Sequence, residues 1–298
     1  MAERVTFNRI VLPTPPALPV SPVTYEQRYH EQNNNVLRLY FNQISNAFAA
    51  LLGGDTTGGK YIQFPYGGFQ DTTVQTAPAD TAQVMRLNTT DFSNGISIVP
   101  RTAVFVGHID DGTPPGAGTV LTVTAMTSGT IYLGMTLTGG AITAGTKVVS
   151  QTSGTAGGVG AYVVSASQER TSLTITGSVP SKITVAQAGI YNLQWSGQFV
   201  NTAAAIHEVS VWIRKNGTDV VGSTGRVSIN AKHGAFDGGG ISAWNYFIDL
   251  RAAEYVELWW STPDVDTYLT FYAAGTTPVR PTTASAIATL TFVSALTA

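Results

Sequence analysis

The sequence predicts a mainly β protein. Its larger part is an antiparallel β-sandwich with a small inserted β-domain, and a proline-rich arm and one long N-terminal α-helix precede it. Between residues 183 and 272, strand-length runs rich in β-branched and aromatic residues are bounded by Gly, Asn, Asp or Pro, which is typical of antiparallel strands. In residues 190–195, polar and apolar side chains alternate, as in a sheet with one wet face and one packed face. Residues 24–52 contain no Pro or Gly and have the features of a long helix.

Residues 1–23 are predicted to form an extended arm, because five prolines lie within ten residues. Proline fixes φ and has no N–H, so this segment should be semi-rigid and unable to join a central strand. We expect either an anchoring arm that lies along another protein or an ordinary linker. The prolines of the predicted arm are Pro13, Pro15, Pro16, Pro19 and Pro22.

Residues 24–54 are predicted to form a helical trimerisation stalk. Thr24 and Gln27 match the capping-box pattern, and Gly53-Gly54 supplies the stop. Apolar residues recur at heptad spacing, and the stripe turns polar toward its N-terminal end, where Asn33 can fix the register. The alternative is a helix that packs on its own β-domain. The predicted stripe consists of His30, Asn33, Leu37, Tyr40, Ile44, Ala47 and Leu51.

The β-rich remainder is predicted to be a discontinuous head, residues 60–100 and 180–298, with an inserted β-domain at residues 102–178. The inserted part is rich in Gly, Thr, Ala and Ser, with a turn about every eight to ten residues. Val99-Pro100 and Val179-Pro180 look like matching borders. Insertions are tolerated where the chain leaves and returns at neighbouring points.

The order of elements in the head resembles the jelly-roll modules of the complement globular-head and tumour-necrosis-factor type. The resemblance covers about residues 183–298. Asn216-Gly217 should form a type I′ hairpin turn after a long strand. A strand opened by Gly238-Gly239-Gly240, the run Tyr255–Trp259 and an aromatic closing strand follow. The resemblance implies a jelly roll of roughly eight strands and a compact homotrimer.

Several phrases resemble virion proteins of marine and cyanobacterial phages, and the insertion is similar to small β-modules of phage structural proteins. The resemblance implies a structural protein located on the virion: an N-terminal anchor to a capsid or tail protein, a three-helix stalk and a projecting head, as in a fibre, knob or capsid decoration. The phrases are Thr24-Tyr25-Glu26-Gln27, Phe41-Asn42-Gln43-Ile44, Phe64-Pro65-Tyr66-Gly67, Leu87-Asn88-Thr89-Thr90 and Ile213-Arg214-Lys215-Asn216-Gly217.

The composition argues against several classes of partner. A net charge of −2 with scattered Lys and Arg gives no basic surface for nucleic acid. The chain has no cysteine, so disulfides and thiolate sites are excluded. It shows no secretory signal, and no apolar run approaches the ~20 residues that span a bilayer. Only 11% of residues are charged. We therefore expect no membrane insertion, and a particle-bound β protein rather than a free cytosolic enzyme.

No catalytic or metal-binding constellation is apparent. His30, His108, His207 and His233 lack the mutual spacing of metal ligands, and Asp110-Asp111-Gly112 is an ordinary turn sequence. Asp264-Val265-Asp266 lacks the further oxygen ligands of a calcium loop. No cluster of acidic residues suggests a glycosidase. We expect neither a cofactor nor an enzymatic activity, and a polysaccharide depolymerase is the least favoured alternative.

The aromatic residues are the remaining candidates for binding. Trp259 and Trp260 should face opposite ways in a strand, so one should be core and the other exposed or at a subunit contact. An exposed ring could stack on a sugar, whereas the alternative is burial in the core or in a trimer interface. The sequence thus leaves open a carbohydrate-binding lectin-like module that recognises a host-surface glycan, or a tail-fibre receptor-binding protein. The aromatic candidates are Trp244, Trp259, Trp260 and Tyr268.

Overall fold

The computed structural model describes residues 16–20, 22–52, 64–112 and 116–296. The chain forms two compact units, Met1–Phe64 and Pro65–Ala298, and each is described here by itself. The predicted stop at Gly53-Gly54 and most of the strand expected at residues 61–64 lie outside the described residues.

The first unit contains a single described helix, α1 (Gln27–Leu52). Its first hydrogen bond runs from the His30 N–H to the Glu26 carbonyl, at 3.4 Å. The predicted start at Thr24 was therefore two residues too early, and Glu26 occupies the N-cap position. No Pro or Gly interrupts the 26 residues of the helix, which favours a continuous helix.

The second unit is built from antiparallel strands, so the predicted mainly β class is confirmed. The first sheet has the order β14-β10-β19-β1-β3, with β16 beside β10. Its strands are β14 (Gly238–Leu250), β10 (Gly189–Asn201), β19 (Ala286–Ser294), β1 (Tyr66–Asp71), β3 (Thr89–Asn94) and β16 (Thr267–Leu269).

The second sheet has the order β12-β11-β15-β9-β4-β5-β8-β7, with β13 beside β11, β2 beside β15 and β6 beside β9. Its strands are β12 (Thr218–Asp219), β11 (His207–Lys215), β15 (Tyr255–Ser261), β9 (Arg170–Val185), β4 (Ile96–Asp110), β5 (Gly118–Ser128), β8 (Gly160–Gln168), β7 (Val148–Gly154), β13 (Gly225–Ile229), β2 (Gln83–Val84) and β6 (Thr136–Thr138). A separate hairpin consists of β17 (Gly275–Thr276) and β18 (Val279–Arg280).

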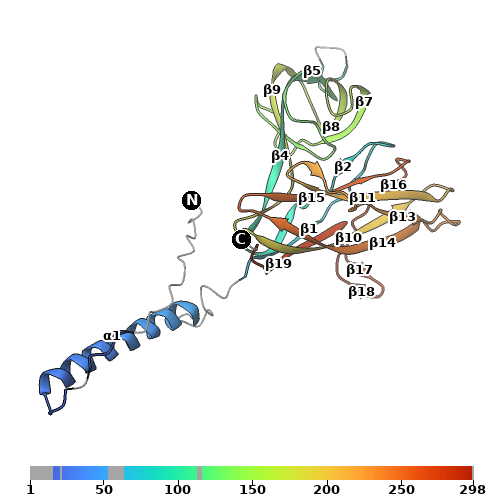
Figure 1. The fold of residues 1–298 in the computed structure, drawn as a ribbon. Helices are drawn as coiled ribbons and strands as arrows, with labels where there is room; N and C mark the ends of the chain where they lie inside the picture. Colours follow the sequence, from blue (N-terminus) through green and yellow to red (C-terminus); the bar gives the residue numbers. More distant parts are fainter. Residues whose placement is uncertain (1–15, 21, 53–63, 113–115, 297–298) are drawn as a thin grey trace. The chain divides into compact units, whose positions relative to one another are not determined.

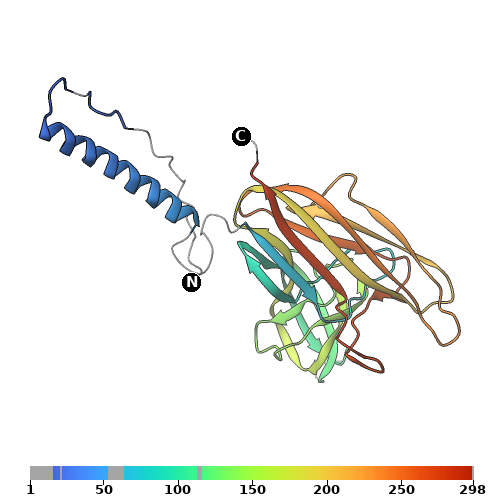
Figure 2. The same ribbon diagram turned by 90° about the horizontal axis from the view of Figure 1, so that it is seen from below.

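The two large sheets face each other across one hydrophobic core (Figures 1 and 2). The predicted alternation in β10 is confirmed, since Tyr191, Leu193 and Trp195 are buried in this core. The predicted turn is also confirmed: Asn216 and Gly217 both have positive φ and join β11 to β12.

The part of the chain predicted as an insertion lies above the sandwich in Figure 1, and it contains most of a second hydrophobic core. Two long strands, β4 and β9, run without a break from the sandwich into this part and remain paired. Pro100 pairs with Pro180 at a register shift, so the two expected borders lie side by side. Both cores belong to one compact unit.

Strand registers define two ends of the sandwich. At the near end, where the chain comes in through Tyr66, Gly189 pairs with Leu250 and Ile190 pairs with Ser294. At the far end, Asn201 pairs with Gly238. β1 is antiparallel to β19, which is antiparallel to β10, so β1 starts at the near end and runs toward the far end.

Candidate functional site

The four aromatic candidates mostly face inward. Trp260 lies in the sandwich core and Trp259 in the second core, with exposed fractions of 0% and 1%. They face opposite ways as predicted, but neither reaches the surface, because the inserted part covers the side on which Trp259 lies. Trp244 packs against Trp195, with ring centroids 4.4 Å apart. Tyr268 is half-buried, and burial, followed by the charges of Asp237 and other neighbours, raises the pKa of its hydroxyl.

The predicted stripe of α1 is its least exposed face. Among the described side chains of the helix, Asn33, Leu37, Tyr40, Ile44 and Ala47 are half-buried, and none is fully buried. His30 is exposed and stacks on Tyr25, with ring centroids 5.0 Å apart. Leu51 is in the helix, but its side chain lies outside the described residues.

The predicted arm is described in part. Pro13 and Pro15 lie outside the described residues, and Pro16, Pro19 and Pro22 are half-buried. The Tyr29 hydroxyl donates a hydrogen bond to the Pro19 carbonyl at 3.2 Å. The described end of the arm is therefore tied to the first turn of α1.

Large apolar side chains are exposed on the outer face of the first sheet, which we call the open face. Paired registers place Tyr66, Thr291, Asn192 and Phe247 in one row across β1, β19, β10 and β14. The neighbouring rows hold Phe92, Gly68, Thr289, Gln194 and Asn245, then Gln70, Ile287, Ser196 and Ala243, and lastly Gln198 and Ile241.

The open face combines exposed hydrophobic groups with an uncharged centre. Ile241 is 68% exposed, Phe247 58% and Phe92 55%. Phe92 lies against Gly68, where a Cβ would come within 2.7 Å of the ring. None of the residues in the four rows is ionisable at neutral pH. Exposed large apolar side chains gathered on one uncharged face indicate a candidate interaction surface.

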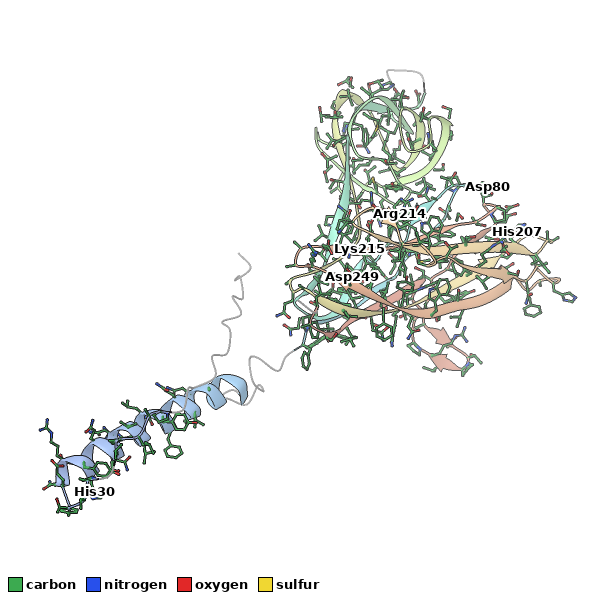
Figure 3. All side chains as sticks on the ribbon, in the orientation of Figure 1. His30, Asp80, His207, Arg214, Lys215 and Asp249 are labelled. Carbon is green, nitrogen blue, oxygen red and sulfur yellow. The ribbon has the colours of Figure 1, made fainter. Side chains whose placement is uncertain are left out.

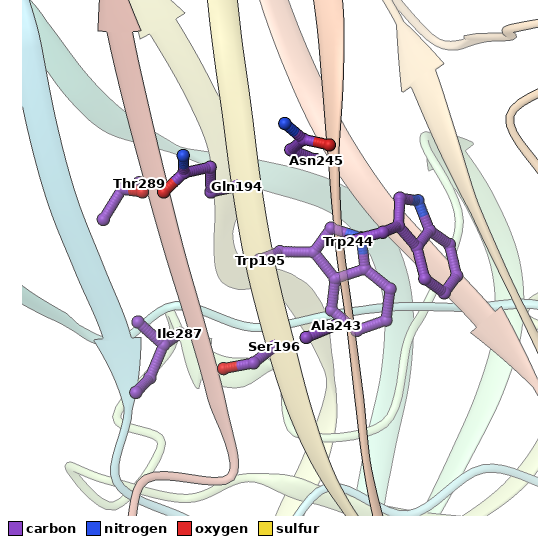
Figure 4. A pocket seen from close by; sticks show the side chains of 8 residues that line it. All are labelled: Gln194, Trp195, Ser196, Ala243, Trp244, Asn245, Ile287 and Thr289. Carbon is purple, nitrogen blue, oxygen red and sulfur yellow. The ribbon is translucent and has the colours of Figure 1, made fainter.

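A groove of about 520 Å³ crosses the middle of the open face (Figure 4). Gln194, Ser196, Asn245 and Thr289 line it, and within the described part of the chain their side chains make no hydrogen bond. The apolar residues of its lining are Ala243, Ile287, Trp195 and Trp244, the last of which is one of the aromatic candidates. The groove therefore offers neutral donors and acceptors beside aliphatic groups. The alternation in β10 predicts that Gln194 and Ser196 lie on one face of the strand. Only the strand registers show that β14 and β19 place their own side chains beside them.

A buried ion pair joins the sandwich to the inserted part. Glu257 is fully buried, and Arg101 donates to its two carboxylate oxygens at 2.9 and 2.6 Å. The Ser181 hydroxyl donates to the same carboxylate at 2.8 Å. Burial works to lower the pKa of Arg101, and the hydrogen bond and charge of Glu257 outweigh it, so the pKa is raised. This network is a structural joint rather than an accessible site.

No metal site is present among the described residues, where no group of three or more His, Cys, Asp or Glu side chains has a suitable arrangement. His108 Nε2 lies 3.4 Å from Asp110 Oδ2, beside a pocket of about 240 Å³. The Asp110 carboxylate also accepts the Gly112 N–H at 2.7 Å, which is the turn geometry that the sequence suggested. No described helix has the length and apolar character that crossing a membrane requires.

No protein-family model matches the sequence, and no curated protein matches it significantly.

Proposed function

We propose that this protein is a non-enzymatic structural component of a phage particle, a homotrimer with a jelly-roll head held to the capsid or tail by its N-terminal arm and helix. The observation that carries the proposal is the open face, an uncharged surface with exposed Phe and Ile side chains. The low content of charged residues and the phage-like phrases of the sequence support a particle-bound location.

The strand order supports a jelly roll. From β9 onward the chain crosses between the two sheets: β10 lies in the first sheet, β11 and β13 in the second, β14 in the first, β15 in the second and β19 in the first. Repeated crossing between two facing antiparallel sheets is the connectivity of jelly rolls.

A second copy of the chain fits the open face better than an unrelated partner does. In a trimer the contacts between neighbouring copies are heterologous, but side chains beside the threefold axis meet their own counterparts, so an uncharged face placed at that axis meets an uncharged face. Each apolar side chain that becomes fully buried contributes about 1.5–3 kcal/mol. The neutral side chains Gln194 and Asn245 can pair across such a contact, because they have no partner within the described part of the chain.

The stalk provides a second self-association surface. Leu37, Tyr40, Ile44 and Ala47 form a stripe at alternating spacings of three and four residues. Such a stripe is buried when helices pack side by side in a left-handed bundle. Asn33 continues the stripe and would fix the register of three helices.

The mass of the full chain in solution tests the trimer. Light scattering should give three times 31.4 kDa for the wild type. Phe247→Asp should weaken the head contact, and Leu37→Asp with Ile44→Asp the stalk contact, so combining all three should give monomers. Val221→Asp is the control, because Val221 is 95% exposed and lies off the open face. A monomeric wild-type chain would refute the trimer.

Particle incorporation tests the anchor. Deleting residues 1–22 should remove the protein from purified particles, while the truncated chain should still form a trimer in solution. Gold labelling of the C-terminal end in electron micrographs would then locate the wild-type head on the capsid or the tail. Undiminished incorporation of the truncated protein would exclude the arm as the anchor.

The groove favours a second candidate function, a carbohydrate-binding module. Its neutral donors and acceptors beside Ile287 and Ala243 resemble the surroundings that a sugar ring needs. Titration with oligosaccharides followed by calorimetry should then show binding that Gln194→Ala with Asn245→Ala abolishes. A flat titration across bacterial surface glycans would discard this candidate.

A further inference from the structure

Hydrogen bonds join the loops at the far end of the sandwich, and several of them come from one buried side chain. Asn201 is fully buried, and its Nδ2 donates to the carbonyls of Ala205 at 2.7 Å and Ile229 at 3.3 Å. Its Oδ1 accepts the Ala203 N–H at 2.9 Å. One side chain thus holds loop 202–206 against the end of β13.

Two further loops are tied to the first. The Lys232 N–H donates to the Ala203 carbonyl at 2.8 Å, which joins loop 230–237 to loop 202–206. The Thr202 N–H donates to the Asp266 carbonyl at 3.0 Å, which joins loop 262–266. His207 Nδ1 lies 2.9 Å from the hydroxyl of the buried Thr267. The three loops therefore form one surface, which we call the far-end loops.

The far-end loops expose apolar side chains at their tips. Phe236 is 80% exposed, Ile206 64% and Val265 59%, one from each loop. Phe236 sits on a tight hairpin closed by hydrogen bonds between the backbones of His233 and Phe236, at 2.8 and 3.1 Å. Binding residues are concentrated on loops that a β scaffold holds in place. Aromatic side chains are among the usual anchors of protein interfaces.

The charges around these tips are mostly negative. Asp237, Asp264 and Asp266 belong to the three loops, whose basic residues are Lys232, 3.5 Å from Asp237, and His233. His207 Nε2, at the edge of these loops, lies 3.7 Å from Asp264 Oδ2. Asp80 lies nearby, because its N–H donates to the Thr262 carbonyl at 2.8 Å. An acidic surface is repelled by anionic lipid and by anionic polysaccharide. It complements a basic surface, which speeds association.

The far end also points away from the attachment of the chain. The near end receives the chain at Tyr66, and Figure 3 shows His207 at the opposite end of the sandwich from Lys215 and Asp249. If the N-terminal segment holds the protein on a particle, as proposed above, the far-end loops are the part of the sandwich most distant from that attachment along the strands.

From these observations we infer that the far-end loops bind a protein on the surface of the host cell, one that presents apolar pockets with a basic rim. Phe236, Ile206 and Val265 enter the apolar pockets, and the carboxylates of Asp264 and Asp266 face the basic rim. Three equivalent sites in a trimer would add avidity to a weak single contact. The inference rests on the proposed function, because attachment to a phage particle is what makes a host-cell protein the expected partner.

The test uses the fluorescently labelled full-length protein and intact host cells, with protease-shaved and periodate-oxidised cells as the comparison. We expect saturable binding that protease removes and periodate leaves intact. Phe236→Ala with Ile206→Ala should weaken binding at least tenfold. Asp264→Asn with Asp266→Asn should weaken it less and reduce its dependence on salt. Val221→Ala, at the near end, is the matched control and should bind like the wild type.

Several results would overturn the inference. Binding that periodate abolishes and protease spares would identify a saccharide instead. Binding to protease-shaved cells and to vesicles of their lipids would identify the membrane. Absence of binding, or full binding by Phe236→Ala with Ile206→Ala, would remove the far-end loops from recognition. Light scattering and particle incorporation of the same variants keep these failures distinct from a failure of the proposed function, since both should be unchanged.

Discussion

Trp259 and Trp260 are neighbours in the sequence and are both buried, yet they belong to different cores. Trp260 lies between the two sheets beside Phe199, with ring centroids 5.9 Å apart. Trp259 points to the other side of the same strand, where Tyr132 of the inserted part meets it edge-on at 5.4 Å. One core lies between the two sheets, and the other forms where residues from 103–179 pack against Val84 and Trp259 on the outside of the sandwich.

The two cores also differ in chemistry. Trp260 packs among apolar side chains such as Val211 and Leu269. Trp259 has the guanidinium groups of Arg214 and Arg101 over its ring, at 3.8 and 5.2 Å, and Arg101 pairs with the buried Glu257. Apolar contacts are tolerant of orientation, whereas a bidentate ion pair is directional. The joint is thus built to fix the position of the inserted part, and the sandwich core to provide stability.

The largest expected effect is that of Trp260→Ala. The substitution leaves a large cavity between the sheets, and the free energy of unfolding should fall by about 4–5 kcal/mol. Urea denaturation followed by circular dichroism, at one fixed protein concentration, measures it. The surface variant Val221→Ala should leave the midpoint unchanged. A loss below about 1 kcal/mol for Trp260→Ala would mean that this core is not the main source of stability.

Trp259→Ala should lower the free energy of unfolding by about 3 kcal/mol. This is the low end for such a substitution, because the inserted part can move to fill the space. The effect should also be local. Hydrogen exchange should speed up in β6 and β8, with little change in β10 and β14. If exchange accelerated equally in all four strands, the two cores would not be separable in the way proposed here.

The sequence predicts the first core much better than the second. Alternation in β10 is a local pattern, so it identifies Tyr191, Leu193 and Trp195 as inward-facing without knowledge of the rest of the chain. The Asn216-Gly217 turn is likewise local. The burial of Trp259 depends on Tyr132, more than 100 positions earlier in the sequence, and nothing near Trp259 indicates that contact.

The candidate surfaces show the same limit. The stripe on α1 was visible as a heptad pattern, because residues on one helix face are close in sequence. The open face requires the registers that bring Asn192, Phe247 and Thr291 into one row, and these are set by long-range pairing. The far-end loops converge because Asn201 and Thr202 reach loops that follow about 30 and 60 residues later.

Breaking the buried ion pair should have the next largest effect. Glu257→Leu leaves Arg101 without its partner, and we expect a loss of about 2–3 kcal/mol, below the usual range because 20% of the Arg101 side chain is exposed. Arg101→Met combined with Glu257→Leu should recover most of the loss, since a well-packed apolar pair can replace a buried ion pair. Urea midpoints of both variants test this. A double variant no more stable than Glu257→Leu would show that the joint needs its charges.

The smallest expected effect belongs to an exposed counterpart of that pair, at the near end. Lys215 Nζ lies 2.9 Å from Asp249 and 3.3 Å from Glu254. The hydrogen bond from Lys215 lowers the pKa of Asp249, and the Arg251 N–H, with help from Lys215, lowers that of Glu254. Because the Asp249 side chain is 65% exposed, Lys215→Met should cost less than about 1 kcal/mol at pH 7.

This last contribution should depend on pH with a definite sign. Both carboxyl groups have a lower pKa when folded, so the unfolded chain takes up their protons first as the pH falls. The stabilisation is complete above the ordinary carboxyl pKa of about 4 and is lost at lower pH. The difference in free energy of unfolding between wild type and Lys215→Met should therefore shrink as the pH falls from about 5 to about 3, where these carboxyl groups take up protons. Lys147→Met, at an exposed lysine, is the control and should show no such trend. A difference between wild type and Lys215→Met that grew as the pH fell would contradict the lowered pKa values of Asp249 and Glu254.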